Sequence, residues 1–190
     1  METNFFGALA VTKGAIPTFR ERRGGTIVMI SSASAFTGTP SQSLYSASKF
    51  ALEGASEALA EELKPFGVRV LMVELGAYRT NFQSAVEKPD SIISEPYKGT
   101  ISDLTAQRIT AGHGRQAGDP VKAAQAIVAV VTGTGRGKDL QDVLRLPLGK
   151  DALQRAHVKI KSLSTDVART RALAEWAVFD EPYDGYPPLK

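Results

Sequence analysis

Cysteine and long apolar runs are absent from this sequence, and each absence excludes a class of protein. The chain has 190 residues and no cysteine, so disulfides, thiolate catalysis and cysteine-based zinc sites are excluded. A chain without cysteine fits the cytoplasm, and we expect that location. No apolar run approaches the ~18 residues of a membrane helix, and no basic segment precedes the apolar stretch at residues 5–11. We therefore expect neither membrane binding nor a signal peptide.

A strong excess of one charge is also missing, which argues against a nucleic-acid partner. The chain carries 23 basic and 20 acidic residues, and its net charge is +3. The basic residues are scattered apart from Arg20, Arg22 and Arg23, and we interpret that cluster as a solvated helix end. The two histidines, His113 and His157, have no partners at metal-ligand spacing, so we predict no metal site.

What the sequence does contain is an ordinary globular composition in which helical and strand patterns alternate. Hydrophobic residues make up 43% of the chain and charged residues 23%, and the length suffices for one domain with a core. Helical spacing predicts helices over residues 5–19, 45–65, 119–131 and 151–178, and apolar runs predict strands over 26–30, 68–73 and 143–148. Residues 76–118 are predicted to be irregular, with short helices around 92–109, and residues 181–190 to be a loose tail. This alternation favours an α/β fold with a parallel sheet and right-handed crossovers.

The residues with the clearest chemical meaning are Tyr45 and Lys49. They are four residues apart in a predicted helix, so their side chains lie on one face. A free tyrosine has a pKa of about 10 and is a poor base at neutral pH. A neighbouring ammonium favours the phenolate and lowers that pKa, so the pair can form a general acid/base. The same spacing also arises by chance on many surface helices.

Ser32 strengthens the interpretation because it follows the predicted strand at residues 26–30 and precedes Tyr45 by thirteen residues. Ligands of open α/β sheets bind just outside the carboxyl ends of the strands. A serine there could donate a hydrogen bond to a substrate carbonyl while Tyr45 delivers a proton. The alternative is that Ser32 caps a local turn, for which Ser31 is equally suited.

An apolar strand that ends in serine, thirteen residues to tyrosine, and lysine four residues later resembles the signature of the short-chain dehydrogenase/reductase family. The similarity continues in both directions, through residues 2–7, 24–28, 51–67, 73–80, 146–149 and the terminal helix. It covers residues 1–180. The resemblance implies the C-terminal catalytic part of a single domain, with a partial Rossmann-like, doubly wound parallel sheet and flanking helices. It also implies an oxidoreductase that uses NAD or NADP to interconvert a ketone or aldehyde and an alcohol.

The resemblance also implies roles for individual residues. Tyr45 would be the general acid/base, and Lys49 would lower its pKa and bind the nicotinamide ribose. Ser32 would polarise the substrate carbonyl, and Asn4 would hold a water in a proton relay to Lys49. Gly76 and Thr80 would lie along the cofactor. Leu75 stands where the family usually has proline, and this loosens a turn that faces the nicotinamide.

The part of the family that holds the dinucleotide phosphates has no counterpart in this chain. Members begin with a strand and a glycine-rich turn, and nothing before Met1 supplies them. The glycines at 133–137 follow a predicted helix and those at 112–114 follow no strand, so we interpret both as loops. We expect a chain truncated at its N-terminus, by gene fragmentation, a mis-assigned start or engineering. NAD and NADP both remain possible cofactors, and the alternative function is a catalytically silent half-domain that dimerises or scaffolds a partner.

Two further expectations concern the substrate and the assembly. Apolar residues in the segment 81–118 suggest a pocket for an apolar carbonyl compound, lined by Phe82, Ile92, Ile93, Tyr97 and Leu104. The helices at residues 4–20 and 45–64 resemble the pair through which family members dimerise, so we expect a homo-oligomer. The strand at 26–30 contains no charge and no proline, and a free edge there would invite pairing with another chain.

Overall fold

The computed structural model describes residues 1–82, 93–179 and 185. These fall into two compact units, Met1–Ala156 and His157–Lys190. The first unit contains the sheet and all of the predicted site residues, and the second begins within the C-terminal helix. The predicted tail at 181–190 lies outside the described residues apart from Gly185.

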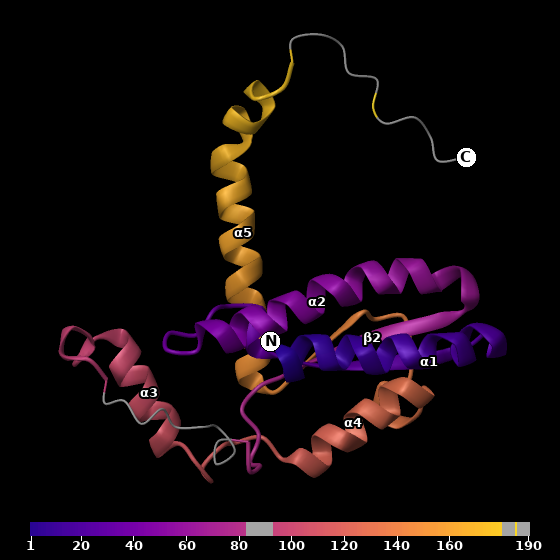
Figure 1. Cartoon of the computed structure of the whole chain (residues 1–190), viewed down its shortest axis with the longest axis horizontal. Helices are drawn as coiled ribbons and strands as arrows, with labels where there is room; N and C mark the ends of the chain where they lie inside the picture. Colours follow the sequence, from indigo (N-terminus) through magenta and orange to yellow (C-terminus); the bar gives the residue numbers. More distant parts are fainter. Residues whose placement is uncertain (83–92, 180–184, 186–190) are drawn as a thin grey trace. The chain divides into compact units, whose positions relative to one another are not determined.

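A three-stranded parallel sheet organises the first unit (Figure 1). It consists of β1 (Gly25–Ser32), β2 (Val68–Leu75) and β3 (Arg145–Leu148), in that order across the sheet. In the register of β1 and β2, Gly25 lies opposite Val68 and Ser32 opposite Leu75, so the two strands end together. The parallel α/β architecture predicted from the sequence is confirmed.

The helices follow the predicted pattern closely. A π-helical segment Glu2–Gly7 leads into α1 (Ala8–Arg22), and α2 (Ser43–Leu63) connects β1 to β2. The segment predicted to be irregular contains α3 (Ile101–Ala111), and α4 (Pro120–Thr132) and α5 (Lys150–Trp176) complete the set. The predicted start of α4 is confirmed in detail, because Asp119 Oδ1 accepts hydrogen bonds from the backbone N–H groups of Val121 and Lys122.

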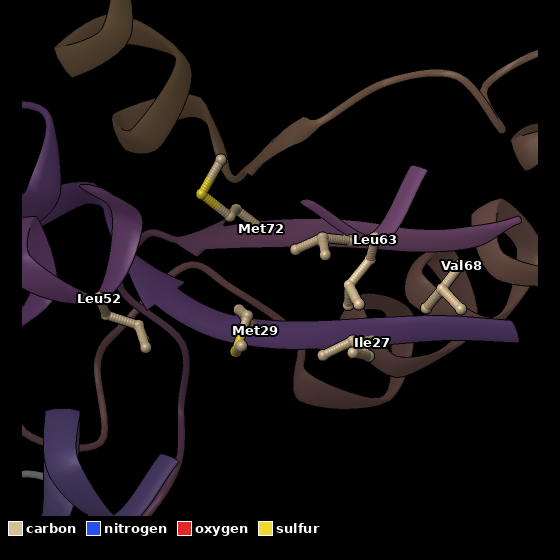
Figure 2. Packing of buried hydrophobic residues seen from close by; sticks show 7 residues of the cluster. Ile27, Met29, Leu52, Leu63, Val68 and Met72 are labelled. Atoms are coloured by element: carbon tan, nitrogen blue, oxygen red, sulfur yellow. The ribbon is translucent and has the colours of Figure 1, made fainter. Parts of the chain in front are cut away.

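Apolar residues pack on both faces of the sheet, because alternate residues of a strand point to opposite faces. On one face, α1 and α2 cover a cluster whose buried members are Ile27, Met29, Leu52, Leu63, Val68, Val70 and Met72 (Figure 2). On the other face, Leu71 and Val73 of β2 pack against Val130 of α4. Burial on both faces explains why the strands are continuous apolar runs rather than alternating ones.

Gly67 makes the sharp turn from α2 into β2. Its φ of +67° is a conformation that residues with a Cβ rarely adopt. A Cβ there would also stand 2.9 Å from the carbonyl oxygen of Arg23. Glycine at this position therefore lets β2 begin beside β1.

The second unit is described for residues 157–179 and 185. The helical part of α5 in this unit exposes most of its apolar side chains, including Ile160, Leu163, Val167 and Trp176. Among the residues that the structure describes, no helix is long and apolar enough to cross a membrane.

Candidate active site

The carboxyl end of β1 and the first turns of α2 bring the predicted catalytic residues together. Ser32 is the last residue of β1, and its Oγ accepts a hydrogen bond from Ser34 N at 3.1 Å, which starts the loop toward α2. Tyr45 stands in the first turn of α2, where the Ser32 hydroxyl is close enough to lower the pKa of its phenol. Two hydroxyl-bearing residues that are thirteen positions apart in the sequence thus lie near each other at the carboxyl end of β1.

The acidity of Tyr45 reflects two opposing influences. Burial raises the pKa of Tyr45, because the half-buried ring holds its phenol away from water, and the hydrogen bond with Ser32 lowers it. Burial is the larger influence, so the pKa of Tyr45 lies above its usual value. The sequence led us to expect that Lys49 lowers this pKa, and that role stays a prediction.

Lys49 lies one turn beyond Tyr45, with its Nζ 6.0 Å from the centroid of the tyrosine ring. The ammonium donates a hydrogen bond to the backbone carbonyl oxygen of Ile30 at 2.8 Å. Burial lowers the pKa of Lys49, and the charge of Glu53 raises it in part. Lys49 thus shares a helix face with Tyr45, as predicted, while its hydrogen bond goes to β1.

Asn4 is connected to the site through the side chain of Ser48. It lies in the π-helical segment before α1, and its Nδ2 donates a hydrogen bond to Ser48 Oγ at 3.2 Å. Ser48 Oγ in turn donates to the carbonyl oxygen of Tyr45 at 2.7 Å. Asn4 is therefore tied to α2 between the two catalytic candidates, and its role in a water relay stays a prediction.

Gly76 and Thr80, predicted to contact a cofactor, have local structural roles in this structure. A Cβ at Gly76 would stand 2.1 Å from Asp151 Oδ1, so the glycine leaves room for this carboxylate, which accepts a hydrogen bond from Ala77 N at 2.7 Å. Thr80 Oγ1 accepts a hydrogen bond from Phe82 N at 3.2 Å. Their contact with a cofactor stays a prediction.

The segment that follows β2 reaches the site through Phe82. The ring centroids of Phe82 and Tyr45 are 5.7 Å apart, with the rings tilted by 56°. An open hollow of roughly 540 Å³ lies beside the loop that precedes Tyr45, lined by Thr39, Pro40, Ser41, Ser43, Ile93, Ser94, Tyr97 and Ser102. Ile93 and Tyr97 thus line this hollow, Leu104 is 54% exposed, and Ile92 lies outside the described residues. That these residues line a substrate pocket stays a prediction.

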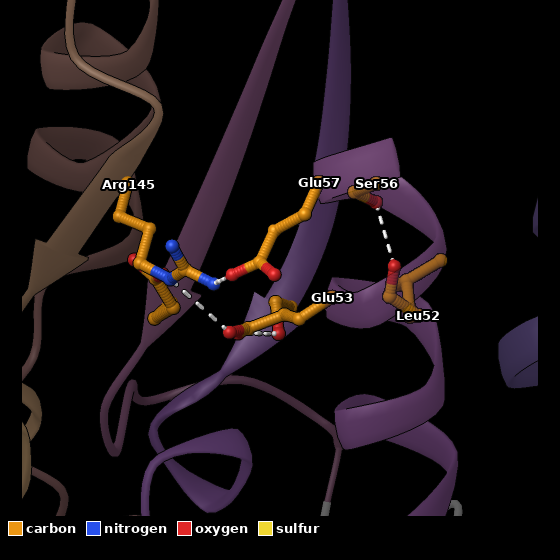
Figure 3. Close-up of polar contacts among 7 residues, drawn as sticks. Leu52, Glu53, Ser56, Glu57 and Arg145 are labelled. Atoms are coloured by element: carbon orange, nitrogen blue, oxygen red, sulfur yellow. Dashed lines mark hydrogen bonds and ion pairs between the residues drawn. The ribbon is translucent and has the colours of Figure 1, made fainter. Parts of the chain in front are cut away.

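A polar cluster beyond Lys49 was not foreseen from the sequence (Figure 3). It joins Glu53 and Glu57 of α2 with Ser31 of β1, Glu74 of β2 and Arg145 of β3. The signal that could have revealed part of it is spacing, because Tyr45, Lys49, Glu53 and Glu57 repeat every four residues. The partners from β2 and β3 meet this face only through tertiary packing.

Comparisons with known proteins agree with this arrangement. A profile described as short chain dehydrogenase matches residues 1–91. The oxidoreductase claN of Passalora fulva is 55% identical over 108 residues, which cover 57% of this chain and 49% of that protein. A solved short-chain dehydrogenase from Streptomyces avermitilis is 33% identical, with a TM-score of 0.76 over 92% of this chain and 60% of that one. The chain belongs to the short-chain dehydrogenase family.

The chain shares the Rossmann-like fold of the solved short-chain dehydrogenase that it resembles. A further relative, retinol dehydrogenase 8 of Bos taurus, is 36% identical over 102 residues, which cover 54% of this chain and 32% of that protein. The chain spans about half the length of claN.

Proposed function

We propose that this protein interconverts a ketone or aldehyde and an alcohol by hydride transfer with NAD or NADP. The observation that carries the proposal is the placement of Ser32 and Tyr45 together at the carboxyl end of a parallel sheet. That edge is where open α/β sheets bind their ligands. Lys49 on the same face of α2 adds the cation that such a pair needs.

The residues of this chain fit the nicotinamide end of the cofactor. Tyr45 and Lys49 are both half-buried and both carry a polar group at the end of β1. The sequence contains no Gly-x-Gly-x-x-Gly run of the kind that receives a pyrophosphate, so the fit concerns the ribose and not the phosphates. The bound dinucleotide supplies the hydride.

The proton then comes from the chain itself. Burial holds the pKa of Tyr45 above its usual value, which keeps the phenol protonated and able to donate to the carbonyl oxygen during reduction. Ser32 donates to the same oxygen and fixes its position. Lys49 provides a positive charge near the phenolate that remains, and Asn4 connects α2 to the start of the chain through Ser48.

The substrate that best suits the surroundings of Tyr45 is an apolar carbonyl compound. Phe82 packs its ring against that of Tyr45, and Ile93 and Tyr97 line the adjacent hollow. Apolar walls with a few polar groups are the usual composition of a small-molecule site. The name of the relative retinol dehydrogenase 8 also points to a substrate with a long apolar part.

An assay of NADH and NADPH oxidation tests the proposal, with a panel of aromatic, long-chain and sugar carbonyl compounds. It is run on this chain and on a fusion that adds the part of the Streptomyces avermitilis dehydrogenase which this chain does not cover. We expect turnover of apolar carbonyls by the fusion. A well-folded fusion that binds the dinucleotide without oxidising it would favour the silent, scaffolding half-domain instead.

A further inference from the structure

One face of α2 carries a series of ionisable residues that continues beyond the proposed active site. Tyr45, Lys49, Glu53 and Glu57 stand four residues apart, so they lie along one side of the helix. Arg145 of β3 contacts the acidic end of this series (Figure 3). The roles assigned to Tyr45 and Lys49 leave this acidic end without a function.

Glu53 is the member that lies next to Lys49, and both of its oxygens are engaged. Ser31 Oγ donates a hydrogen bond to Glu53 Oε1 at 2.6 Å, and Arg145 Nε lies 3.5 Å from Glu53 Oε2. The residue is only 6% exposed. Burial raises the pKa of Glu53, and the hydrogen bond from Ser31 and the charge of Arg145 both counteract it by stabilising the carboxylate.

The charges of the cluster balance when Glu74 is neutral. Glu74 is fully buried, and its oxygens accept no hydrogen bond from the residues that the structure describes, although Arg145 Nε lies 3.5 Å away. Burial and the charge of Glu53 raise the pKa of Glu74 to about 8, so the proton stays on Glu74 at neutral pH. Counted together with Lys49, which lies one turn before Glu53 on α2, the cluster then has two cations, Lys49 and Arg145, and two carboxylates, Glu53 and Glu57.

The positive charge of Lys49 depends on nearby carboxylates, because burial alone favours the neutral amine. Taking an ammonium out of water favours the neutral amine, and a nearby carboxylate opposes that effect. Within the described residues, the charged group identified as raising the pKa of Lys49 is Glu53. An uncharged Lys49 would give no electrostatic support to the Tyr45 phenolate.

We propose that Glu53 is a positioning residue that acts through Lys49. Ser31 and Arg145 hold its carboxylate in place, and the carboxylate keeps the neighbouring ammonium charged. The catalytic consequence rests on the proposed oxidoreductase function, whereas the coupling between Glu53 and Lys49 is a property of the folded chain alone.

The titration of Lys49 by NMR tests this coupling directly, without cofactor or substrate. With lysine labelled at ¹³Cε, we expect the Lys49 ammonium of Glu53→Gln to titrate at a lower pH than in the unmodified chain. Glu53→Asp retains the charge and should restore the higher titration pH, at least in part. Glu57→Gln is the matched control, because Glu57 contacts the same Arg145 from the same helix but lies one turn farther from Lys49.

Two results would overturn the proposal: a Glu53→Gln titration equal to that of the unmodified chain, or an equal decrease in Glu57→Gln. If the Glu53 variants do not fold, the titration of Lys49 in the unmodified chain tests the coupling instead. Its Lys49 signal must then show a second inflection at the pH where the carboxyl carbon of Glu53 titrates, and a signal with no such inflection contradicts the coupling.

Kinetics connect the coupling to catalysis in an active protein. In Glu53→Gln we expect kcat to decrease more than KM changes, and the alkaline limb of the pH profile to move to lower pH. A purely structural role would leave that limb in place. If no carbonyl compound is turned over by any variant, the proposed function fails, while the NMR titration still decides the role of Glu53.

Discussion

Lys49 donates its ammonium hydrogen bond to the carbonyl oxygen of Ile30 at 2.8 Å, and not to the phenol of Tyr45. Ile30 belongs to β1, which among the described residues pairs with β2 alone. The ammonium thereby satisfies a backbone carbonyl near the end of the strand. To bind a ribose hydroxyl, Lys49 has to share or release this contact, so the proposed cofactor site involves a change of hydrogen-bond partner at Lys49.

Removing the Ser32 hydroxyl should raise the pKa of Tyr45 further. The hydrogen bond with Ser32 is the interaction that lowers this pKa, so Ser32→Ala leaves burial unopposed. We expect the Tyr45 signal to titrate at a higher pH in ¹³Cζ-tyrosine NMR. Ser31→Ala is the matched control, because the neighbouring hydroxyl donates to Glu53 instead. Equal titration of Tyr45 in the two variants would contradict the assignment of Ser32.

Glu74 should make the folded chain lose stability as the pH rises. Its pKa is raised from 4.5 to about 8, so the folded state holds a proton that the unfolded state releases between these values. The stabilisation is complete below about pH 4.5 and is lost as the pH rises through about 8. At ~1.4 kcal/mol for each pKa unit, the full difference is on the order of 5 kcal/mol.

Urea unfolding from pH 5 to pH 9 measures this dependence. We expect the slope of stability against pH to become flatter in Glu74→Gln, which imitates the protonated carboxyl. Glu57→Gln removes a half-exposed carboxylate from the same cluster and should retain the slope. Parallel curves for the unmodified chain and Glu74→Gln would show that Glu74 is ionised at neutral pH.

Self-association through the first helices is expected from the apolar side chains that they expose. Val11 of α1 is 76% exposed and Phe50 of α2 is 39% exposed, and Phe6 before α1 is 52% exposed. Exposed apolar groups on neighbouring elements are typical of a protein interface. In sedimentation velocity at micromolar concentration, we expect a dimer that the double variant Val11→Glu/Phe50→Glu converts to monomer.

The control for this experiment is Val121→Glu, which places the same charge on the exposed face of α4. It should leave the dimer intact. A dimer that persists in the double variant would indicate pairing at β1, and a monomeric unmodified chain would contradict the expected assembly altogether.

The sequence was sufficient for those features that depend on short-range spacing. The strand at residues 26–30, the helix that carries Tyr45 and Lys49, and the Asp119 cap all depend on patterns within a few residues, and each is confirmed. The proximity of Ser32 and Tyr45 was predictable because both lie at one end of the same crossover. Spacing alone did not indicate the influence of burial on the pKa of Tyr45.

The remaining features depend on residues that meet only in the folded chain. Lys49 donates a hydrogen bond to the carbonyl oxygen of Ile30 across the β1–α2 connection, and Arg145 of β3 forms an ion pair with Glu53 of α2. The missing side chain of Gly76 makes room for Asp151 of α5, which the sequence did not indicate, and the predicted contact of Gly76 with a cofactor stays a prediction. Long-range packing of this kind leaves no periodic signal in the sequence.

The central claim is that Tyr45 transfers a proton in a carbonyl reduction, and the most direct test compares two phenol deletions. Tyr45→Phe removes the proposed acid, and Tyr78→Phe removes a partly buried phenol elsewhere in the first unit. With the carbonyl compound that the panel identifies, we measure kcat/KM of both variants and confirm folding by circular dichroism. The account predicts a loss of about 10²- to 10⁴-fold for Tyr45→Phe and near-normal turnover for Tyr78→Phe. Normal turnover by a folded Tyr45→Phe would contradict it.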